Sequence, residues 1–176
     1  MPNIPPISLD AAGATRPMLE DIRNQLGAVP NIFSTFAHSP AVLKGFLAFN
    51  GALGSGVLAA TVREKIALAI AGANQCDYCA FAHSVLAAAA GIDKPESAIN
   101  LTGSSSDART QAMLNFVLSV VAQHGEISPD ELETLRSFDI SDAEIVEILA
   151  HVGINLFTNY FNHVVKTEID FPFVAT

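Results

Sequence analysis

The sequence contains no tryptophan and only two cysteines, and few of its residues carry a charge. Charged residues make up 15% of the 176 residues, whereas a typical soluble domain has about 25%. A chain with so few charges has difficulty covering its whole surface with polar side chains. We therefore expect a homo-oligomer, in which an apolar face of one copy packs against another copy.

Basic residues are scarce as well. The chain has 9 lysines and arginines against 18 aspartates and glutamates, which gives a formal charge of -9. Such an excess of negative charge repels nucleic acid, and no cluster of basic residues is present to bind anionic lipid. We therefore expect neither nucleic acid nor membrane as a partner, but small neutral substrates or other proteins.

Long apolar runs and a targeting segment are also missing. The longest apolar stretches, residues 66–73 and 85–92, are far shorter than the roughly 20 residues of a membrane-spanning helix. The first residues, MPNIPPISLDAAGATRP, have neither a basic start nor an apolar run, so they do not resemble a secretory signal. These features predict a cytoplasmic protein, in a compartment that keeps thiols reduced. Two cysteines three positions apart then indicate reactive thiols rather than a structural cross-link.

Signals for β-strands are scarce, with no Asn-Gly hairpin turn and no sustained alternation. Apolar residues recur instead at helical spacing between proline, glycine and capping residues. The pattern predicts an all-α, compact helical bundle, with an extended arm over residues 1–15 and a single domain over residues 16–176. Helices are expected at residues 17–26, 31–38, 40–54, 76–90 and 106–124, and further helices are expected to begin near residue 61 and at capping boxes of Ser128 and Ser141.

The residues with the clearest chemistry are Cys76, Cys79 and His83, which are spaced by three and four positions. On a helix this spacing places all three on one face. Cys76 lies near the expected helix start, where the helix dipole lowers the pKa of a thiol. His83, one turn after Cys79, can take a proton from the Cys79 thiol and so produce the nucleophilic thiolate. Such an activity requires sulfur atoms that solvent can reach and an imidazole beside them.

Glu64 has two competing interpretations. A tight turn at residues 72–75 would pack its helix antiparallel to that of His83, with the two side chains at comparable height, so that the carboxylate orients the imidazole and raises its basicity. Glu64 is also the third residue after Thr61, and Thr-x-x-Glu is a capping box. A carboxylate that reaches back to Thr61 points away from His83.

The spacing Glu64-x11-Cys76-x2-Cys79-x3-His83 resembles the active-site signature of alkylhydroperoxidase D-like proteins, within the carboxymuconolactone decarboxylase superfamily. Three flanking segments are similar to the peroxidase-related branch of that family: VPNIF at 29–33, NYFNH at 159–163 and TEID at 167–170. The resemblance covers roughly residues 20–172. It implies an all-α fold, assembly into dimers, trimers or hexamers, and thiol-dependent reduction of hydroperoxides.

The resemblance also implies roles for single residues. Cys79 would attack the peroxide as a thiolate, Cys76 would resolve the intermediate, His83 would accept the proton, and Glu64 would end the relay. The reductant would be an external dithiol, which in relatives is a lipoyl-bearing protein, and the chemistry requires no metal or organic cofactor. The best-studied relatives have a histidine where this chain has Tyr78. A phenol, with a pKa of about 10, can donate a hydrogen bond to sulfur but cannot shuttle protons near neutral pH.

Other interpretations stay open at this point. The place of Cys76 at the helix start favours Cys76, rather than Cys79, as the attacking thiolate. The cysteines could be inert core residues, or could bind zinc together with His83, although no second pair of ligands lies elsewhere in the sequence. The chain could also be a carboxymuconolactone decarboxylase-like enzyme, although those relatives lack the cysteine pair, or a non-catalytic redox-sensing oligomer.

Four polar residues step by four along the last expected helix: His151, Asn155, Asn159 and His163. Each step of four drifts by about 40° around the helix, so the two ends of the set do not share one face. We therefore expect a solvated or interface stripe rather than a functional site.

Overall fold

The computed structural model describes residues 1–170, and this part of the chain contains nine α-helices, two 3-10 turns and no β-strand. The all-α prediction is confirmed. The 3-10 turns are η1 (Leu9–Ala11) and η2 (Gly13–Thr15). The α-helices are α1 (Arg16–Leu26), α2 (Asn31–Phe36), α3 (Pro40–Gly54), α4 (Ala60–Ala73), α5 (Asp77–Ala89), α6 (Lys94–Asn100), α7 (Ala108–Ala122), α8 (Pro129–Ser137) and α9 (Asp142–Val165).

Local capping signals determine where the last two helices begin. Ser141 accepts a hydrogen bond from the N–H of Glu144 (3.3 Å), and the Glu144 carboxylate accepts one from the N–H of Ser141 (2.9 Å). The box at Ser128 and Glu131 opens α8 in the same way. These reciprocal bonds satisfy N–H groups that have no partner within the helix, and both predicted helix starts are confirmed.

The extended arm predicted for residues 1–15 is extended only in part, because its second half forms η1 and η2. The physical reason lies in Thr15, whose buried hydroxyl donates to the carbonyl of Ala12 (2.7 Å) and closes the second turn. The first half is extended and lies against the helical bundle. Asn3 donates its backbone N–H to the carbonyl of Val165 (2.7 Å), at the end of α9.

The helix α6 was not predicted, because seven residues are too few to show a helical period. Asp93 caps it by accepting from the N–H of Glu96 (2.9 Å). Its position depends on tertiary contacts, since Lys65 of α4 donates to the Glu96 carboxylate (2.7 Å), which also accepts from the hydroxyl of Ser105 (2.7 Å). This cluster fixes α6 against α4.

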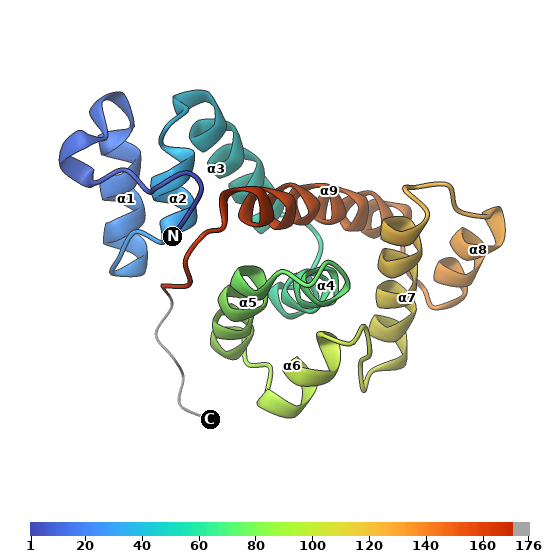
Figure 1. Ribbon diagram of the computed structural model, residues 1–176. Coiled ribbons are helices and arrows are strands. Elements are labelled where there is room, and N and C mark those ends of the chain that lie inside the picture. Colours follow the sequence, from blue (N-terminus) through green and yellow to red (C-terminus); the bar gives the residue numbers. More distant parts are fainter. Residues whose placement is uncertain (171–176) are drawn as a thin grey trace.

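The helix α4 lies at the centre of the molecule, in contact with α5, α6, α7 and α9 (Figure 1). Six consecutive α4 residues, 66–71, are buried, as expected of a helix with neighbours on all sides. Figure 1 shows the long α9 crossing over α4 and α5, with α1 to α3 gathered at one end and α7 and α8 at the other. Within the described residues no helix is long and apolar enough to cross a membrane.

Gly72, near the end of α4, allows a close approach between helices. A Cβ atom at this position would collide with the backbone carbonyl of Leu101, which follows α6. We expect Gly72→Ala to lower the free energy of unfolding by about 2 kcal/mol, as overpacking does elsewhere, measured by urea denaturation. Gly51→Ala is the matched control, because an added Cβ there meets open space. That change should instead raise stability by about 0.5–1 kcal/mol, and equal effects of the two substitutions would contradict the prediction.

Candidate active site

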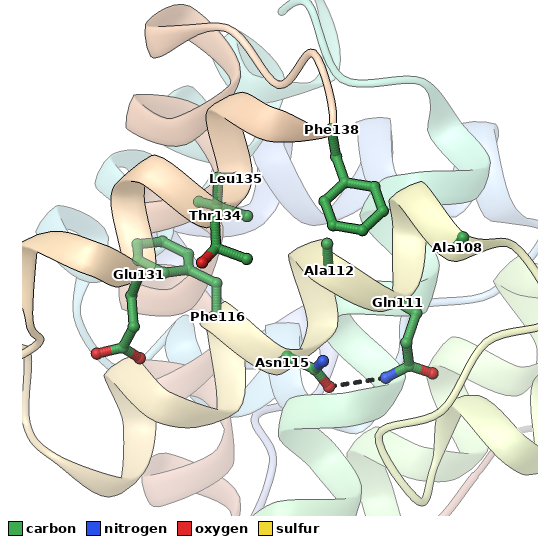
Figure 2. Close-up of a pocket in the computed structure, with 9 residues that line it drawn as sticks. All are labelled: Ala108, Gln111, Ala112, Asn115, Phe116, Glu131, Thr134, Leu135 and Phe138. Atoms are coloured by element: carbon green, nitrogen blue, oxygen red, sulfur yellow. Dashed lines mark hydrogen bonds between the residues drawn. The ribbon is translucent and has the colours of Figure 1, made fainter.

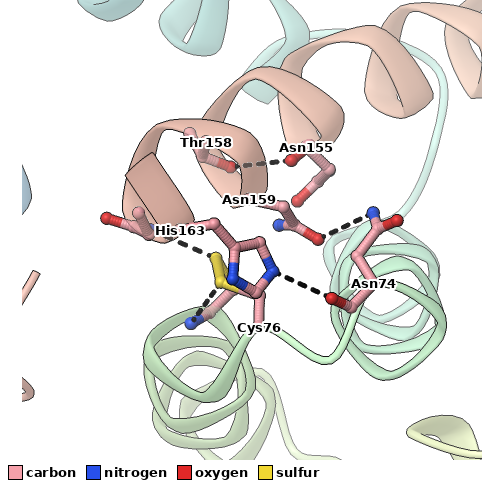
Figure 3. Close-up of a disulfide and its surroundings, with 8 residues drawn as sticks. Asn74, Cys76, Asn155, Thr158, Asn159 and His163 are labelled. Atoms are coloured by element: carbon pink, nitrogen blue, oxygen red, sulfur yellow. Dashed lines mark hydrogen bonds between the residues drawn. A yellow bond between two sulfur atoms is a disulfide. The ribbon is translucent and has the colours of Figure 1, made fainter. Parts of the chain in front are cut away.

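The turn between α4 and α5 is pinned to α9. Gln75 adopts a left-handed conformation (φ 55°), which lets the chain reverse tightly after α4. Asn74 donates from its side chain to the Asn159 side-chain oxygen (3.0 Å), and Nε2 of His163 lies 2.9 Å from the Asn74 carbonyl oxygen (Figure 3). These contacts hold the start of α5, and so the first cysteine, in a fixed position beside α9.

Cys76 and Cys79 form a disulfide across the first turn of α5, with their Cα atoms 5.3 Å apart. Cys76 is the N-cap of the helix, and its sulfur accepts a hydrogen bond from the N–H of Cys79 (3.4 Å). The positive end of the helix dipole and the free N–H groups of the first turn favour negative charge on a sulfur at this place. The pair therefore has the position expected of a reactive dithiol.

Asn162 on α9 is a site residue that the sequence did not reveal. Its side-chain N–H donates to the sulfur of Cys79 (3.2 Å), and the residue is buried. Each sulfur of the disulfide thus receives one N–H hydrogen bond, and the two donors lie 83 positions apart in the chain. In the sequence, Asn162 stood out only as part of the NYFNH segment, which resembles the family but to which no role had been assigned.

Both cysteines are deeply buried, with 2% of Cys76 and 3% of Cys79 exposed. They belong to an apolar cluster that contains Phe36, Ala71 and Tyr78, with Phe46 and Phe161 packed against it. This differs from the expectation of solvent-accessible sulfurs. The oxidised protein is closed around its disulfide, so any reductant requires an opening movement of the elements that cover it.

Glu64 binds His83. The Nδ1 atom of His83 lies 2.8 Å from Oε2 of Glu64, and both side chains are partly buried. The predicted capping box at Thr61 is wrong, since α4 begins at Ala60 and its N-cap, Ala59, accepts no side-chain bond. Glu64 is therefore free to orient the imidazole.

The N–H groups that precede α4 are satisfied by a distant residue instead. The carboxylate of Glu147 on α9 accepts from the N–H groups of Val57 (2.7 Å) and Leu58 (3.0 Å). These hydrogen bonds keep the pKa of Glu147 below its usual value. A carboxylate from a distant part of the chain thus satisfies the N–H groups of the loop that leads into α4.

A cavity of about 160 Å³ is lined by Glu64 and His83, and by His151 and Asn155 of α9. The stripe of α9 that was expected to be solvated is therefore largely buried, with His151, Asn155 and Asn159 each no more than 6% exposed. That expectation was wrong because α9 turns this polar side toward α4 rather than toward solvent; His163 alone of the four is exposed.

A larger hollow, of about 310 Å³, lies between α7 and α8 (Figure 2). Its lining is mainly apolar, with a hydrogen bond from Gln111 to Asn115 (2.8 Å) at one side. It contains no cysteine or histidine, so it offers no nucleophile and no base for the chemistry considered above.

Tyr78 lies between the two cysteines and joins three segments. Its hydroxyl donates to Oδ1 of Asp170 (3.1 Å) and accepts from the N–H of Ile32 at the start of α2 (3.3 Å). Burial raises the pKa of the phenol well above its usual value, so Tyr78 stays neutral. The residue therefore ties the segment after α9 and the start of α2 to the helix that carries the disulfide.

We expect Tyr78→Phe to accelerate reduction of the disulfide. The loss of a hydrogen bond of about 1 kcal/mol raises the population of the open form by about fivefold, and the rate of reduction by dithiothreitol should rise accordingly. Tyr160→Phe is the matched control, because Tyr160 is 54% exposed on α9. An unchanged rate of reduction in Tyr78→Phe would mean that the movement that exposes the disulfide does not break the hydrogen bonds of the Tyr78 hydroxyl.

Known proteins resemble the chain in sequence and in fold. The model of the carboxymuconolactone decarboxylase family matches residues 40–120. The solved structure of an alkylhydroperoxidase AhpD core, a peroxidase-related protein from Ralstonia eutropha JMP134, is 26% identical; the match covers 95% of this chain and 93% of that chain, with a TM-score of 0.85. A peroxidase-related protein from Silicibacter sp. TM1040 is also 26% identical, over 89% of this chain and 84% of that chain, with a TM-score of 0.81.

The same fold occurs in a protein of different activity. A variant of the debrominase Bmp8, solved in complex with 2,3,4-tribromopyrrole, is 18% identical over 96% of this chain and 91% of that chain, with a TM-score of 0.81. No curated protein sequence matches the chain. The family match over residues 40–120, the two peroxidase-related structures and the shared fold together support assignment of the chain to the AhpD-like proteins of the carboxymuconolactone decarboxylase superfamily.

Proposed function

We propose that the protein is an enzyme that reduces hydroperoxides with its Cys76–Cys79 dithiol. One arrangement supports this proposal: a cysteine pair within disulfide distance at the start of α5, followed one turn later by a histidine that a carboxylate orients. A nucleophile, a base and a group that orients the base are the parts that thiol catalysis needs. The two peroxidase-related relatives point in the same direction.

The proposed cycle has three steps. His83, oriented by Glu64, takes the proton from Cys79, whose thiolate attacks the terminal oxygen of ROOH; the O–O bond breaks, and Cys79 sulfenic acid and ROH result. Cys76 then attacks the sulfenic acid, which releases water and leaves the disulfide. An external dithiol reduces that disulfide by exchange and becomes a disulfide itself.

The remaining partners follow from this cycle. The reductant is a small dithiol or a lipoyl-bearing protein, and no cofactor is needed because sulfur carries the electrons. A supply of dithiol fits a cytoplasmic location. The homo-oligomer remains a prediction as well, and apolar side chains exposed along α9, such as Val146, Tyr160 and Val164, offer one face for it.

The proposal is tested by peroxide consumption. The purified protein, supplied with dihydrolipoamide and hydrogen peroxide or tert-butyl hydroperoxide, should consume both substrates in equal amounts over many turnovers. A variant that lacks both thiols, Cys76→Ser with Cys79→Ser, should consume none above the uncatalysed rate. Absence of turnover in the native protein would refute the proposed function.

A second candidate function rests on the burial of the disulfide. A pair that is 2% and 3% exposed is protected from small oxidants and reductants, as suits a redox sensor that responds only when the covering elements open. The same experiment separates the two candidates. Reversible formation of the disulfide without peroxide turnover would favour the sensor, whereas turnover would favour the enzyme.

A further inference from the structure

The sulfur of Cys79 lies where water solvates a negative charge poorly. Cys79 is buried in the apolar cluster that also contains Phe36 and Tyr78. Burial in such surroundings raises the pKa of a thiol, because the thiolate loses its contact with water. A thiolate at Cys79 therefore needs a hydrogen-bond donor that the protein itself supplies.

The donors for the two sulfurs come from different parts of the chain. The backbone N–H of Cys79, in the first turn of α5, donates to the sulfur of Cys76 (3.4 Å). The sulfur of Cys79 instead accepts from the side-chain N–H of Asn162 on α9 (3.2 Å). Among the described residues, Asn162 is the only side chain that forms a hydrogen bond to either sulfur.

The side chain of Asn162 forms no second hydrogen bond. The residue is 5% exposed, and its Oδ1 atom is buried without a partner in the described part of the chain. A buried carbonyl oxygen that lacks a partner destabilises the folded protein. A buried amide that binds sulfur alone is therefore a poor choice for stability, and its position against a reacting atom indicates a role in the chemistry.

We propose that Asn162 is a catalytic residue that stabilises the thiolate of Cys79 through its side-chain N–H. A hydrogen bond to a charged acceptor is about twice as strong as one to a neutral acceptor. The amide therefore favours the thiolate over the thiol and over the disulfide. In the proposed cycle, His83 accepts the proton, whereas Asn162 holds the charge that remains on sulfur, as a donor of an oxyanion hole does for oxygen.

This inference rests on the proposed function for the peroxide step, but its effect on the thiol can be measured without peroxide. In a Cys76→Ser background Cys79 is the one remaining cysteine, and the ¹³Cβ resonance of labelled cysteine follows its ionisation. Asn162→Leu keeps the approximate size of the side chain and removes the N–H. It should raise the pKa of Cys79 by about one unit, which means tenfold less thiolate at a pH below that pKa.

Two further variants in the same background complete this measurement. Asn162→Asp keeps the shape of the side chain but replaces the donor by a negative charge, so it should raise the pKa of Cys79 further. Thr158→Val is the matched control: Thr158 is also buried on α9, but its hydroxyl donates to the carbonyl of Asn155 within the helix (3.0 Å; Figure 3). It should leave the pKa of Cys79 unchanged.

The reduction potential supplies the second measurement, in protein that retains both cysteines. At a pH above the pKa of Cys79 in both proteins, Asn162→Leu should shift the equilibrium with glutathione about tenfold toward the disulfide, which corresponds to a potential about 29.6 mV lower. A purely structural role of Asn162 would lower the free energy of unfolding and move neither the pKa nor the potential. Unchanged values in folded Asn162→Leu, or in Asn162→Asp should leucine prevent folding, would overturn the inference.

The outcomes separate this inference from the proposed function. A raised pKa and a lowered potential in Asn162→Leu, in a protein whose native form turns over no peroxide, would support the role of Asn162 at the thiolate and refute the peroxidase. Peroxide turnover by the native protein, together with an unchanged pKa and potential in Asn162→Leu, would refute the role of Asn162 and leave the peroxidase in place.

Discussion

Cys79→Ser is expected to abolish peroxide reduction completely, including the first turnover. Serine has nearly the same shape as cysteine, but its hydroxyl is not deprotonated near neutral pH and does not form a sulfenic acid. The hydrogen bond from Asn162 and the position one turn before His83 would then act on an unreactive group. The measurement is a single-turnover assay, in which reduced protein is mixed with one equivalent of peroxide and the alcohol is quantified.

Cys76→Ser is the matched variant, and it should retain that first turnover. Cys79 would still attack the peroxide, but no resolving thiol would be present, so one alcohol per chain would form and Cys79 would remain as a sulfenic acid. Mass spectrometry would detect the added oxygen on Cys79. The opposite pattern, in which Cys76→Ser loses the first turnover and Cys79→Ser keeps it, would make the N-cap cysteine the attacking thiolate.

Features that depend on neighbouring residues could be predicted from the sequence. The capping boxes at Ser128 and Ser141 determine the starts of α8 and α9, because the bonds that close them span three residues. The spacing of Cys76, Cys79 and His83 places them on successive turns of α5 for the same reason. A tight turn after α4 then brings Glu64 to His83, so the contact between these two side chains also followed from local geometry.

Features that depend on distant residues could not be predicted in this way. The capping box expected at Thr61 does not form because α4 already begins at Ala60, which places Thr61 inside the helix. The N–H groups of Val57 and Leu58, just before the helix, bind Glu147, some ninety positions later in the chain. Asn162 reaches Cys79 only because α9 crosses over α5, and the polar side of α9 is buried for the same reason. The burial of the disulfide likewise depends on how separate helices cover it, and residue type alone does not decide this.

Glu64→Gln is expected to lower kcat by about a hundredfold while leaving the fold intact. The amide has the shape of the carboxylate and can still contact Nδ1 of His83, but it carries no charge to stabilise the imidazolium that forms when Cys79 loses its proton. Glu131→Gln is the matched control, since that carboxylate caps α8 and accepts from Ser128 and Ser119. It should lower the stability of the protein without changing the rate.

A double variant tests whether Glu64 acts through His83. If the carboxylate only orients and stabilises the imidazole, His83→Gln already removes everything that Glu64 contributes. The double variant should then have the same kcat as His83→Gln alone. Additive losses would place Glu64 in direct contact with the substrate, on the wall of the cavity that it shares with His151. A normal rate in Glu64→Gln would remove the carboxylate from the mechanism and leave the 2.8 Å contact as a purely structural one.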